Sequence, residues 1–241
     1  MKLLVIFFAI IQQLVAKSLP SFLHVCNKSD PNLAECVTTA IEELRPYLVK
    51  GVPEFNIPSI EPLFMNELIS EESGDLRIIA NNVKTYGCSD FFVRGMKMNL
   101  DDQYYEIDIE LPLLRIEAYY NVSGKVLMMP IRGEGPLQAN VTNCRSRTVL
   151  KGELYDKNGE TYIRYKEMTM HVIVGGGIAK VENLFNGDKF LNDMINDVIN
   201  KNFDAFLLEL MPVIERSLTA AFLEIANAIV APYTFKQLYP H

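Results

Sequence analysis

Residues 188–230 read DKFLNDMINDVINKNFDAFLLELMPVIERSLTAAFLEIANAIV. Apolar side chains recur at helical spacing along this stretch and form one broad face, while most charged side chains lie elsewhere. A continuous helix of this length would extend roughly 60 Å at about 1.5 Å per residue, which exceeds the diameter of an ordinary compact domain. We expect Pro212 to kink it. The stretch therefore predicts a long C-terminal helix in an elongated molecule, with the rest of the chain arranged along it.

The middle of the chain, from about residue 75 to residue 174, changes to a period of two, which indicates strands with one apolar face. The alternation is clearest in three runs, residues 105–111, 114–121 and 137–142. Turns are expected at Asn121–Gly124 and at Lys157–Gly159. These features predict an antiparallel meander whose apolar side covers the helix.

A shorter amphipathic helix is predicted from Leu33 to Leu48 by apolar residues every three or four positions. Ser29-Asp30-Pro31 precedes it with capping chemistry, and the helix should end near Lys50-Gly51, before a proline-rich extended segment. The fold class is therefore α+β. A curved antiparallel sheet around one long helix can leave a lengthwise apolar tunnel where the two do not meet.

The N-terminus, residues 1–16, has the charged start, apolar centre and small-residue end of a signal peptide, with cleavage expected near residues 16–18. Its apolar run is about half of the roughly 20 residues that cross a bilayer. No linker or repeat divides residues 17–241, which we expect to form a single domain. The formal net charge of −7, without a basic stripe, argues against nucleic acid and stable membrane insertion as partners.

Four cysteines in an exported chain invite disulfides. Cys26 and Cys36 are the favoured pair because they are close together near the mature N-terminus, whereas Cys88 and Cys144 could be paired or free. Three sequons, which fit passage through the secretory pathway, begin at Asn27, Asn121 and Asn140. The second and third fall on the polar faces of predicted strands, where a glycan could be attached.

No catalytic group emerges from the sequence. Its histidines, His24, His171 and His241, are not at metal-ligand spacing, and Gly-x-Ser-x-Gly is absent. Gly175–Gly177 reads as a turn at the end of a strand and not as a phosphate loop. The alternating carboxylates of 106–110 fit a solvated outer face. We expect no enzyme activity, no metal site and no cofactor.

Two terminal segments resemble the insect takeout and juvenile hormone binding protein family. In LPSFLHVCNKSDPNLAECVTTAIEELRPYLVKGVPEFNIPSIEPL, residues 19–63, a cysteine pair brackets Ser-Asp-Pro and precedes Gly-x-Pro-x-x-x-Ile-Pro and Glu-Pro-Leu. Residues 185–240 share Asn-Gly-Asp, the long helix and the closing Pro232-Tyr233 through Pro240. The resemblance implies a highly curved sheet around a long helix with an interior hydrophobic tunnel, in the tubular lipid-binding superfamily. It also implies a Cys26–Cys36 disulfide.

This resemblance favours the takeout branch, because juvenile hormone binders proper carry a second disulfide that Cys88 and Cys144 do not match, and Phe203 stands where many relatives have tryptophan. It implies an extracellular carrier of a terpenoid hormone, fatty acid or pheromone-like lipid, linked in takeout-like members to circadian, feeding or behavioural regulation. Methionine is frequent in the strands and the long helix and adapts to guests of varied shape. By parity, we expect the tunnel to be lined by Ile107, Ile109, Ile116, Met128, Met168, Met194, Val198 and Phe206.

The sequence leaves other functions open. The chain could be an extracellular signalling or recognition protein that binds an unidentified receptor and transports no ligand. A lipid-directed hydrolase would need a nucleophile and base, which the sequence does not reveal. Binding of bacterial lipopolysaccharide is disfavoured by the acidic charge.

Overall fold

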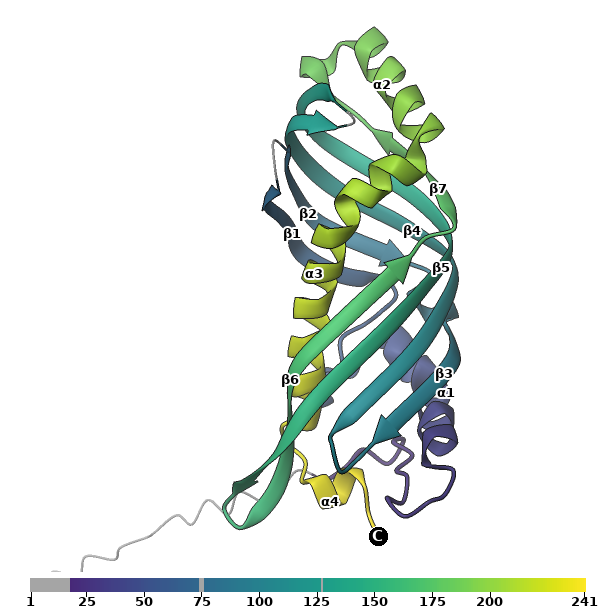
Figure 1. Cartoon of the computed structure of the whole chain (residues 1–241), viewed down its shortest axis with the longest axis vertical. Helices are drawn as coiled ribbons and strands as arrows, with labels where there is room; N and C mark the ends of the chain where they lie inside the picture. The colour runs from purple at the N-terminus through teal and green to yellow at the C-terminus, as the bar shows by residue number, and fades with distance from the viewer. Residues whose placement is uncertain (1–17, 74–75, 127) are drawn as a thin grey trace, which may run out of the picture.

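The computed structural model describes residues 18–73, 76–126 and 128–241, and the expected signal peptide lies outside these residues. The molecule is elongated, with α3 running along one side of a long curved sheet (Figure 1). The helices are α1 (Leu33–Lys50), α2 (Lys189–Lys201), α3 (Phe203–Val230) and α4 (Phe235–Leu238). The strands are β1 (Leu63–Ser73), β2 (Leu76–Tyr86), β3 (Phe92–Asn99), β4 (Tyr104–Val126), β5 (Met129–Lys157), β6 (Glu160–Ile173) and β7 (Gly176–Val181). The α+β class expected from the sequence is confirmed.

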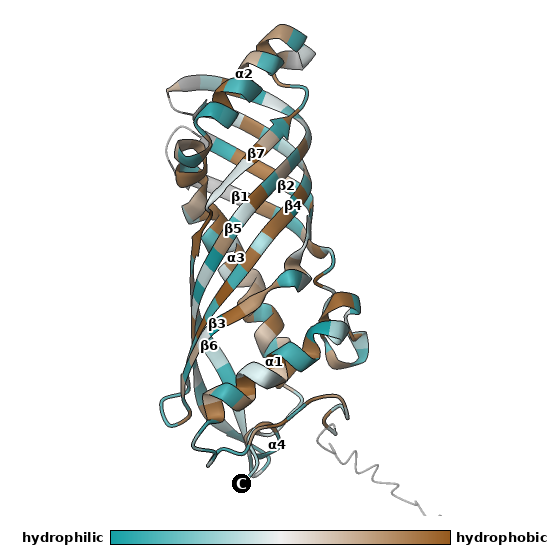
Figure 2. Cartoon of the chain, turned by 90° about the vertical axis from the view of Figure 1, so that its right-hand side faces the viewer, coloured by the Kyte–Doolittle hydropathy of each residue, from teal (hydrophilic) through white to brown (hydrophobic). Residues whose placement is uncertain are grey.

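Two very long strands form the centre of the antiparallel sheet. The strand order is β1-β2-β4-β5-β6, with β3 also paired to β4 and β7 also paired to β5. β4 has 23 residues and β5 has 29, so each is long enough to pair with two strands in succession along one edge. Hydrophobic and hydrophilic bands alternate along these strands (Figure 2), as the period of two requires.

The runs 105–111 and 114–121 belong to one strand, β4. The apolar parity changes between them without a shift in register, since Leu111 pairs with Cys144 and Leu113 with Thr142. The change lies beside Asn143 of β5, whose φ is 52°. The expected turn at Asn121–Gly124 is wrong. Asn121 pairs with Ile79 on one side and Glu134 on the other, and the next reversal joins the paired residues Val126 and Met129.

The second expected turn is confirmed. Lys157 pairs with Glu160, while Asn158 and Gly159 take positive φ angles of 56° and 81°, as a two-residue hairpin turn of type I′ requires. Of Gly175–Gly177, where a turn was expected, Gly175 lies between β6 and β7, whereas Gly176 and Gly177 are paired residues of β7. Gly177 is needed for close packing, because a Cβ atom there would lie 2.7 Å from the Phe203 ring of α3.

The N-terminal helix is confirmed as α1, which begins at Leu33 and ends before Gly51 at φ 72°. Its N-cap position is Asn32 and not a residue of 29–31, although the Asp30 carboxylate accepts a 2.8 Å hydrogen bond from the Asn32 N–H. A disulfide joins Cys26, which precedes this helix, to Cys36 in its first turn, as expected.

The expected 188–230 helix is interrupted at Asn202, which separates α2 from α3. The Asn202 side chain donates to the Val198 carbonyl over 2.9 Å, and its backbone angles, φ −122° and ψ 32°, are not helical. A polar side chain that bonds its own backbone in this way competes with helix continuation. Pro212, where a kink was expected, lies inside α3, and the helix continues through it.

Asparagine side chains from α2 pair with the outer edge of β7. Asn196 accepts from the Val181 N–H over 2.8 Å and donates to the Val181 carbonyl over 2.8 Å. Asn200 makes the same pair of bonds to Ala179 at 2.8 and 2.9 Å. Asn192 donates to the Val181 carbonyl and accepts from the Leu184 N–H. The three side-chain amides take the place of a neighbouring strand, because they bond backbone N–H and C=O groups of the sheet edge that would otherwise lack partners.

Side chains of α3 form hydrogen bonds with backbone groups at the edge of β6 in the same way. Asn227 accepts from and donates to the backbone of Tyr165, each over 2.9 Å. Farther up the helix, the Glu215 carboxylate accepts from the Val172 N–H over 2.7 Å. Because β6 and β7 follow one another along β5, the two helices together cover one continuous sheet edge.

The half of the molecule nearer α2 contains a packed core. It joins the inner faces of β4, β5 and β7 to both helices, and it consists of Tyr120, Val122, Ile131, Val141, Cys144, Ala179, Val181, Leu184, Ile195, Ile199 and Phe203. Several residues of this set are under 5 % exposed, including Leu184 at 1 %. This core fixes the start of α3 against the sheet.

We predict that Asn196→Ala lowers the free energy of unfolding by about 1–3 kcal/mol, because it removes the side-chain partner of the Val181 N–H. Asp197→Ala is the matched control on the same helix, since it removes only an exposed contact to Lys201, with an expected cost of about 0.5 kcal/mol or less. Denaturant unfolding measures both. Equal losses for the two variants would contradict the edge-sealing role of Asn196.

Candidate ligand-binding interior

The inner face of the sheet between β3 and β6 is apolar and faces the side occupied by α3. Tyr105, Ile107 and Ile109 share parity with Leu111, which packs on the core cluster beside Phe203. Their neighbours on the same face follow from the register: Val93, Met96 and Met98 on β3, Ser146, Thr148 and Leu150 on β5, and Met168, Met170 and Val172 on β6. The Ser146 and Thr148 hydroxyls lie 3.3 Å apart, which agrees with their shared face.

These inner side chains are less buried than the core cluster. Ile107, Ile109, Met168 and Met170 are only half-buried. Of the α3 residues, all of which the structure describes, Phe203 alone is buried, although the helix is mostly apolar. Protein interiors are normally close-packed, so accessible apolar surface on both facing elements indicates a wall that a guest could contact.

A group of tyrosines lies at the end of this interior near α4. Tyr105 and Tyr165 meet edge to face with ring centroids 5.7 Å apart. The Tyr105 hydroxyl donates to Gln103 Oε1 over 3.2 Å and also neighbours the hydroxyls of Tyr165 and of Tyr239, which directly follows α4. Burial, followed by these neighbouring hydroxyls, raises the pKa of Tyr105. The three phenols therefore stay protonated and can donate hydrogen bonds.

The eight residues that were expected to line the tunnel lie in several different environments. Ile107, Ile109 and Met168 lie on the inner face described above. Ile116 and Phe206 pack against the core cluster, and Val198 is half-buried on α2. Met194 is 46 % exposed on α2, and Met128 is 87 % exposed between β4 and β5. The last two do not have the burial of an interior wall.

Sequence reasoning missed Met96, Met98, Met170 and Thr148 as members of the inner face. Alternation within each strand was visible, but only the register with β4 shows which parity faces inward. The asparagines of α2 were also missed. Their spacing at positions 192, 196 and 200 was the available signal, since it places three amides on one helix face.

The alternating carboxylates of β4 lie on the outer face, in ion pairs. Glu106 contacts Lys97 at 2.8 Å, and the bonds from Lys97 and Tyr104 lower its pKa. Arg147 binds Asp108 at 2.8 Å. An open depression of about 420 Å³ on this face is rimmed mainly by charged residues, and Ile109 contributes to its wall.

The sequons all lie at exposed positions: Asn27, Asn121 and Asn140. Asn121 donates to Glu134 over 3.0 Å on the outer face of the sheet. In the part of the chain that the structure describes, no helix is both long and apolar enough to span a bilayer.

The sequence matches the model of the family described as haemolymph juvenile hormone binding protein over residues 3–240. The chain belongs to this family. Among similar proteins, the circadian clock-controlled protein daywake of Drosophila melanogaster is 23 % identical over 235 residues, covering 93 % of this chain and 89 % of that one. The putative beta-carotene-binding protein of Schistocerca gregaria is 20 % identical over 216 residues, covering 89 % and 86 %.

The fold of this family member is similar to the crystal structure of Epiphyas postvittana Takeout 1. The TM-score is 0.76 at 22 % identity, covering 90 % of this chain and all of that one. The family resemblance expected from the terminal motifs is thereby confirmed, as is the arrangement of a long antiparallel sheet with a long C-terminal helix. The family's description names the binding of juvenile hormone in the haemolymph.

The other two cysteines, Cys88 and Cys144, are free thiols and form no disulfide. Cys144 is buried, and Cys88 is half-buried. Burial raises the pKa of the Cys144 thiol to about 11. Burial, with a smaller effect of the Glu61 carboxylate, raises the pKa of the Cys88 thiol to about 12. Both thiols are therefore poor nucleophiles at neutral pH.

We predict that native Cys88 and Cys144 react with iodoacetamide at pH 8 at least 100-fold more slowly than in the denatured chain. An ordinary thiol with a pKa of about 8.5 is roughly one-quarter ionised at that pH, whereas a thiol with a pKa of about 11 is ionised in about one molecule in a thousand. Because the raised pKa values favour the protonated form, labelling should accelerate as the pH rises toward 11. Mass spectrometry of labelled peptides measures the rates, and equal native and denatured rates would contradict the burial.

Proposed function

We propose that this protein is a secreted carrier that binds and transports a small hydrophobic ligand in a tunnel between the inner face of the sheet and α3. The observation that carries the proposal is that apolar side chains on both facing elements are only partly buried, in a chain whose family is described by hormone binding. The proposed lining is Met96, Met98, Ile107, Ile109, Ile116, Met168, Met170, Val198 and Phe206.

The chemistry of this wall favours a lipid such as a terpenoid hormone, a fatty acid or a pheromone-like compound. Methionine side chains are flexible and polarizable, so they adapt to chains of different shape. Burying about 300 Å² of apolar ligand surface at roughly 25 cal/mol per Å² would contribute on the order of 7 kcal/mol before the costs of association. The tyrosine group near α4 could donate a hydrogen bond to a polar end of the ligand.

Export is part of the proposal. The signal-like residues 1–16, the Cys26–Cys36 disulfide and the exposed sequons are all typical of secreted proteins. We propose glycans at Asn27, Asn121 and Asn140, a mature domain from residue 17, and a role in binding and not in catalysis. The clock-controlled relative in Drosophila supports a role in circadian, feeding or behavioural regulation.

Lipid extraction and native mass spectrometry of the chain secreted from insect cells test the proposal. We expect a co-purifying lipid, or saturable binding of an added fatty acid or terpenoid probe at one molecule per chain. A folded chain that purifies empty and binds neither probe class would contradict the carrier function. It would favour the signalling alternative.

Two threonine substitutions test the location. Thr148→Phe places a large ring on the inner face of β5, so we predict at least tenfold weaker binding of a long-chain fatty acid probe, because the ring occupies ligand space. Thr169→Phe on β6 is the matched control, because this residue is exposed on the outer face opposite Val149. Its affinity should be unchanged in a probe-displacement titration. Equal affinities for both variants, with folding verified by circular dichroism, would place the ligand elsewhere.

A further inference from the structure

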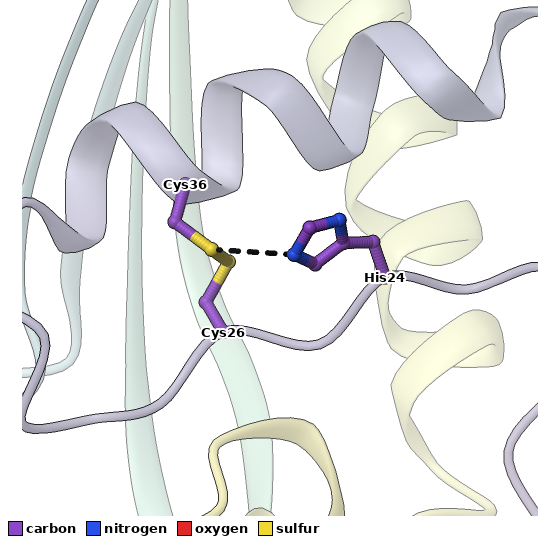
Figure 3. Close-up of side chains that lie close together, drawn as sticks. All are labelled: His24, Cys26 and Cys36. Carbon is purple, nitrogen blue, oxygen red and sulfur yellow. Dashed lines mark hydrogen bonds between the residues drawn. A yellow bond between two sulfur atoms is a disulfide. The ribbon is translucent and has the colours of Figure 1, made fainter.

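His24 lies beside the Cys26–Cys36 disulfide, in the segment that precedes α1. Its Nε2 atom is 3.7 Å from the Cys36 Sγ atom (Figure 3). The potential ligand atoms of His24, Cys26 and Cys36 all lie within 4.8 Å of one another. We propose that reduction of this disulfide creates a zinc site of two thiolates and one imidazole, so that Zn²⁺ replaces the covalent cross-link.

Two sulfurs and one imidazole nitrogen are a ligand set that zinc prefers. In the oxidised chain both sulfurs are committed to the disulfide, and the thiolate is the form that binds a metal. A dithiol reductant supplies two electrons and two hydrogens, closes its own disulfide and leaves Cys26 and Cys36 as thiols. Zn²⁺ binding then releases one proton from each thiol.

Glu43 orients the imidazole for this role. Its Oε2 atom is 3.1 Å from His24 Nδ1, so His24 donates the Nδ1 proton to the carboxylate. The other ring nitrogen, Nε2, faces the Cys36 sulfur and is the one left to bind a metal once the disulfide is reduced. Metal-binding histidines usually donate their second ring nitrogen to such a partner. Glu43 and Cys36 are seven residues apart on α1, which places them on one face of the helix two turns apart.

The surroundings keep the three ligands together and leave one side open. Cys26 is 3 % exposed and Cys36 is half-buried in α1, so the released thiols remain neighbours, with Cα atoms 5.9 Å apart. The His24 side chain is 44 % exposed. Water can therefore complete a tetrahedral zinc site from that side. The metal would keep the loop between the cysteines closed when the disulfide is absent.

The test uses the full mature chain, with Co²⁺ as an optical probe and Zn²⁺ as its competitor. We expect the chain reduced with a phosphine to bind one equivalent of Co²⁺, with thiolate-to-cobalt charge-transfer absorption that Zn²⁺ abolishes. The oxidised chain should give no such band. Binding of equal strength to the oxidised chain, or absorption that persists in Cys26→Ser/Cys36→Ser and so comes from Cys88 and Cys144, would overturn the proposal.

Matched variants show whether the site needs the folded α1. Glu43→Gln should weaken Zn²⁺ binding about 10–100-fold, while Glu42→Gln, whose carboxylate contacts Arg45, should leave it unchanged. His24→Ala should weaken binding at least tenfold, and His171→Ala should not. If α1 unfolds on reduction, Glu43 has no special position and the two glutamate variants behave alike. That result would overturn the proposal, as would an unchanged affinity for His24→Ala.

Discussion

The structure depends on the pairing of side-chain amides with the open edge of the sheet. A strand edge exposes backbone N–H and C=O groups that need partners. In this protein Asn192, Asn196 and Asn200 supply them for β7, and Asn227 with Glu215 supplies them for β6. Because these bonds extend from α2 to the far end of α3, they hold both helices along the edge of the curved sheet.

This constraint explains why the interior has two different halves. Near α2 the helix-to-edge bonds are closely spaced, and the enclosed side chains pack into a buried core around Leu184, Ile195 and Ile199. Farther along α3, Glu215 and Asn227 are the side chains that bond the strand backbone among the described residues, and the apolar residues on both sides keep accessible surface. The packed half gives stability, while the looser half provides the apolar wall on which the carrier proposal rests.

Local patterns predicted the class of the fold, α1, the Lys157–Gly159 hairpin and the N-terminal disulfide, because each depends on neighbours in sequence. Long-range strand pairing produced one error, and a local side-chain bond produced another. Asn121–Gly124 has turn composition, but pairing with β2 and β5 on both sides keeps it extended. The helix break at Asn202 depends on its side-chain bond to Val198. Within the candidate site, parity places Ile107, Ile109 and Met168 on the same sheet face. Met128 and Met194 are exposed, because parity gives neither the turn position nor the buried helix face.

The central claim is that a lipid lies between the inner sheet face and α3. Methyl NMR of the chain with a spin-labelled fatty acid tests it most directly, because paramagnetic broadening falls steeply with distance. The account predicts broadened methyl signals for Ile107, Met168 and Met170, with little change at Ile173 and Ile178, which are 56 % and 61 % exposed. Broadening of Ile173 and Ile178 while Ile107 and Met168 stay sharp would contradict it.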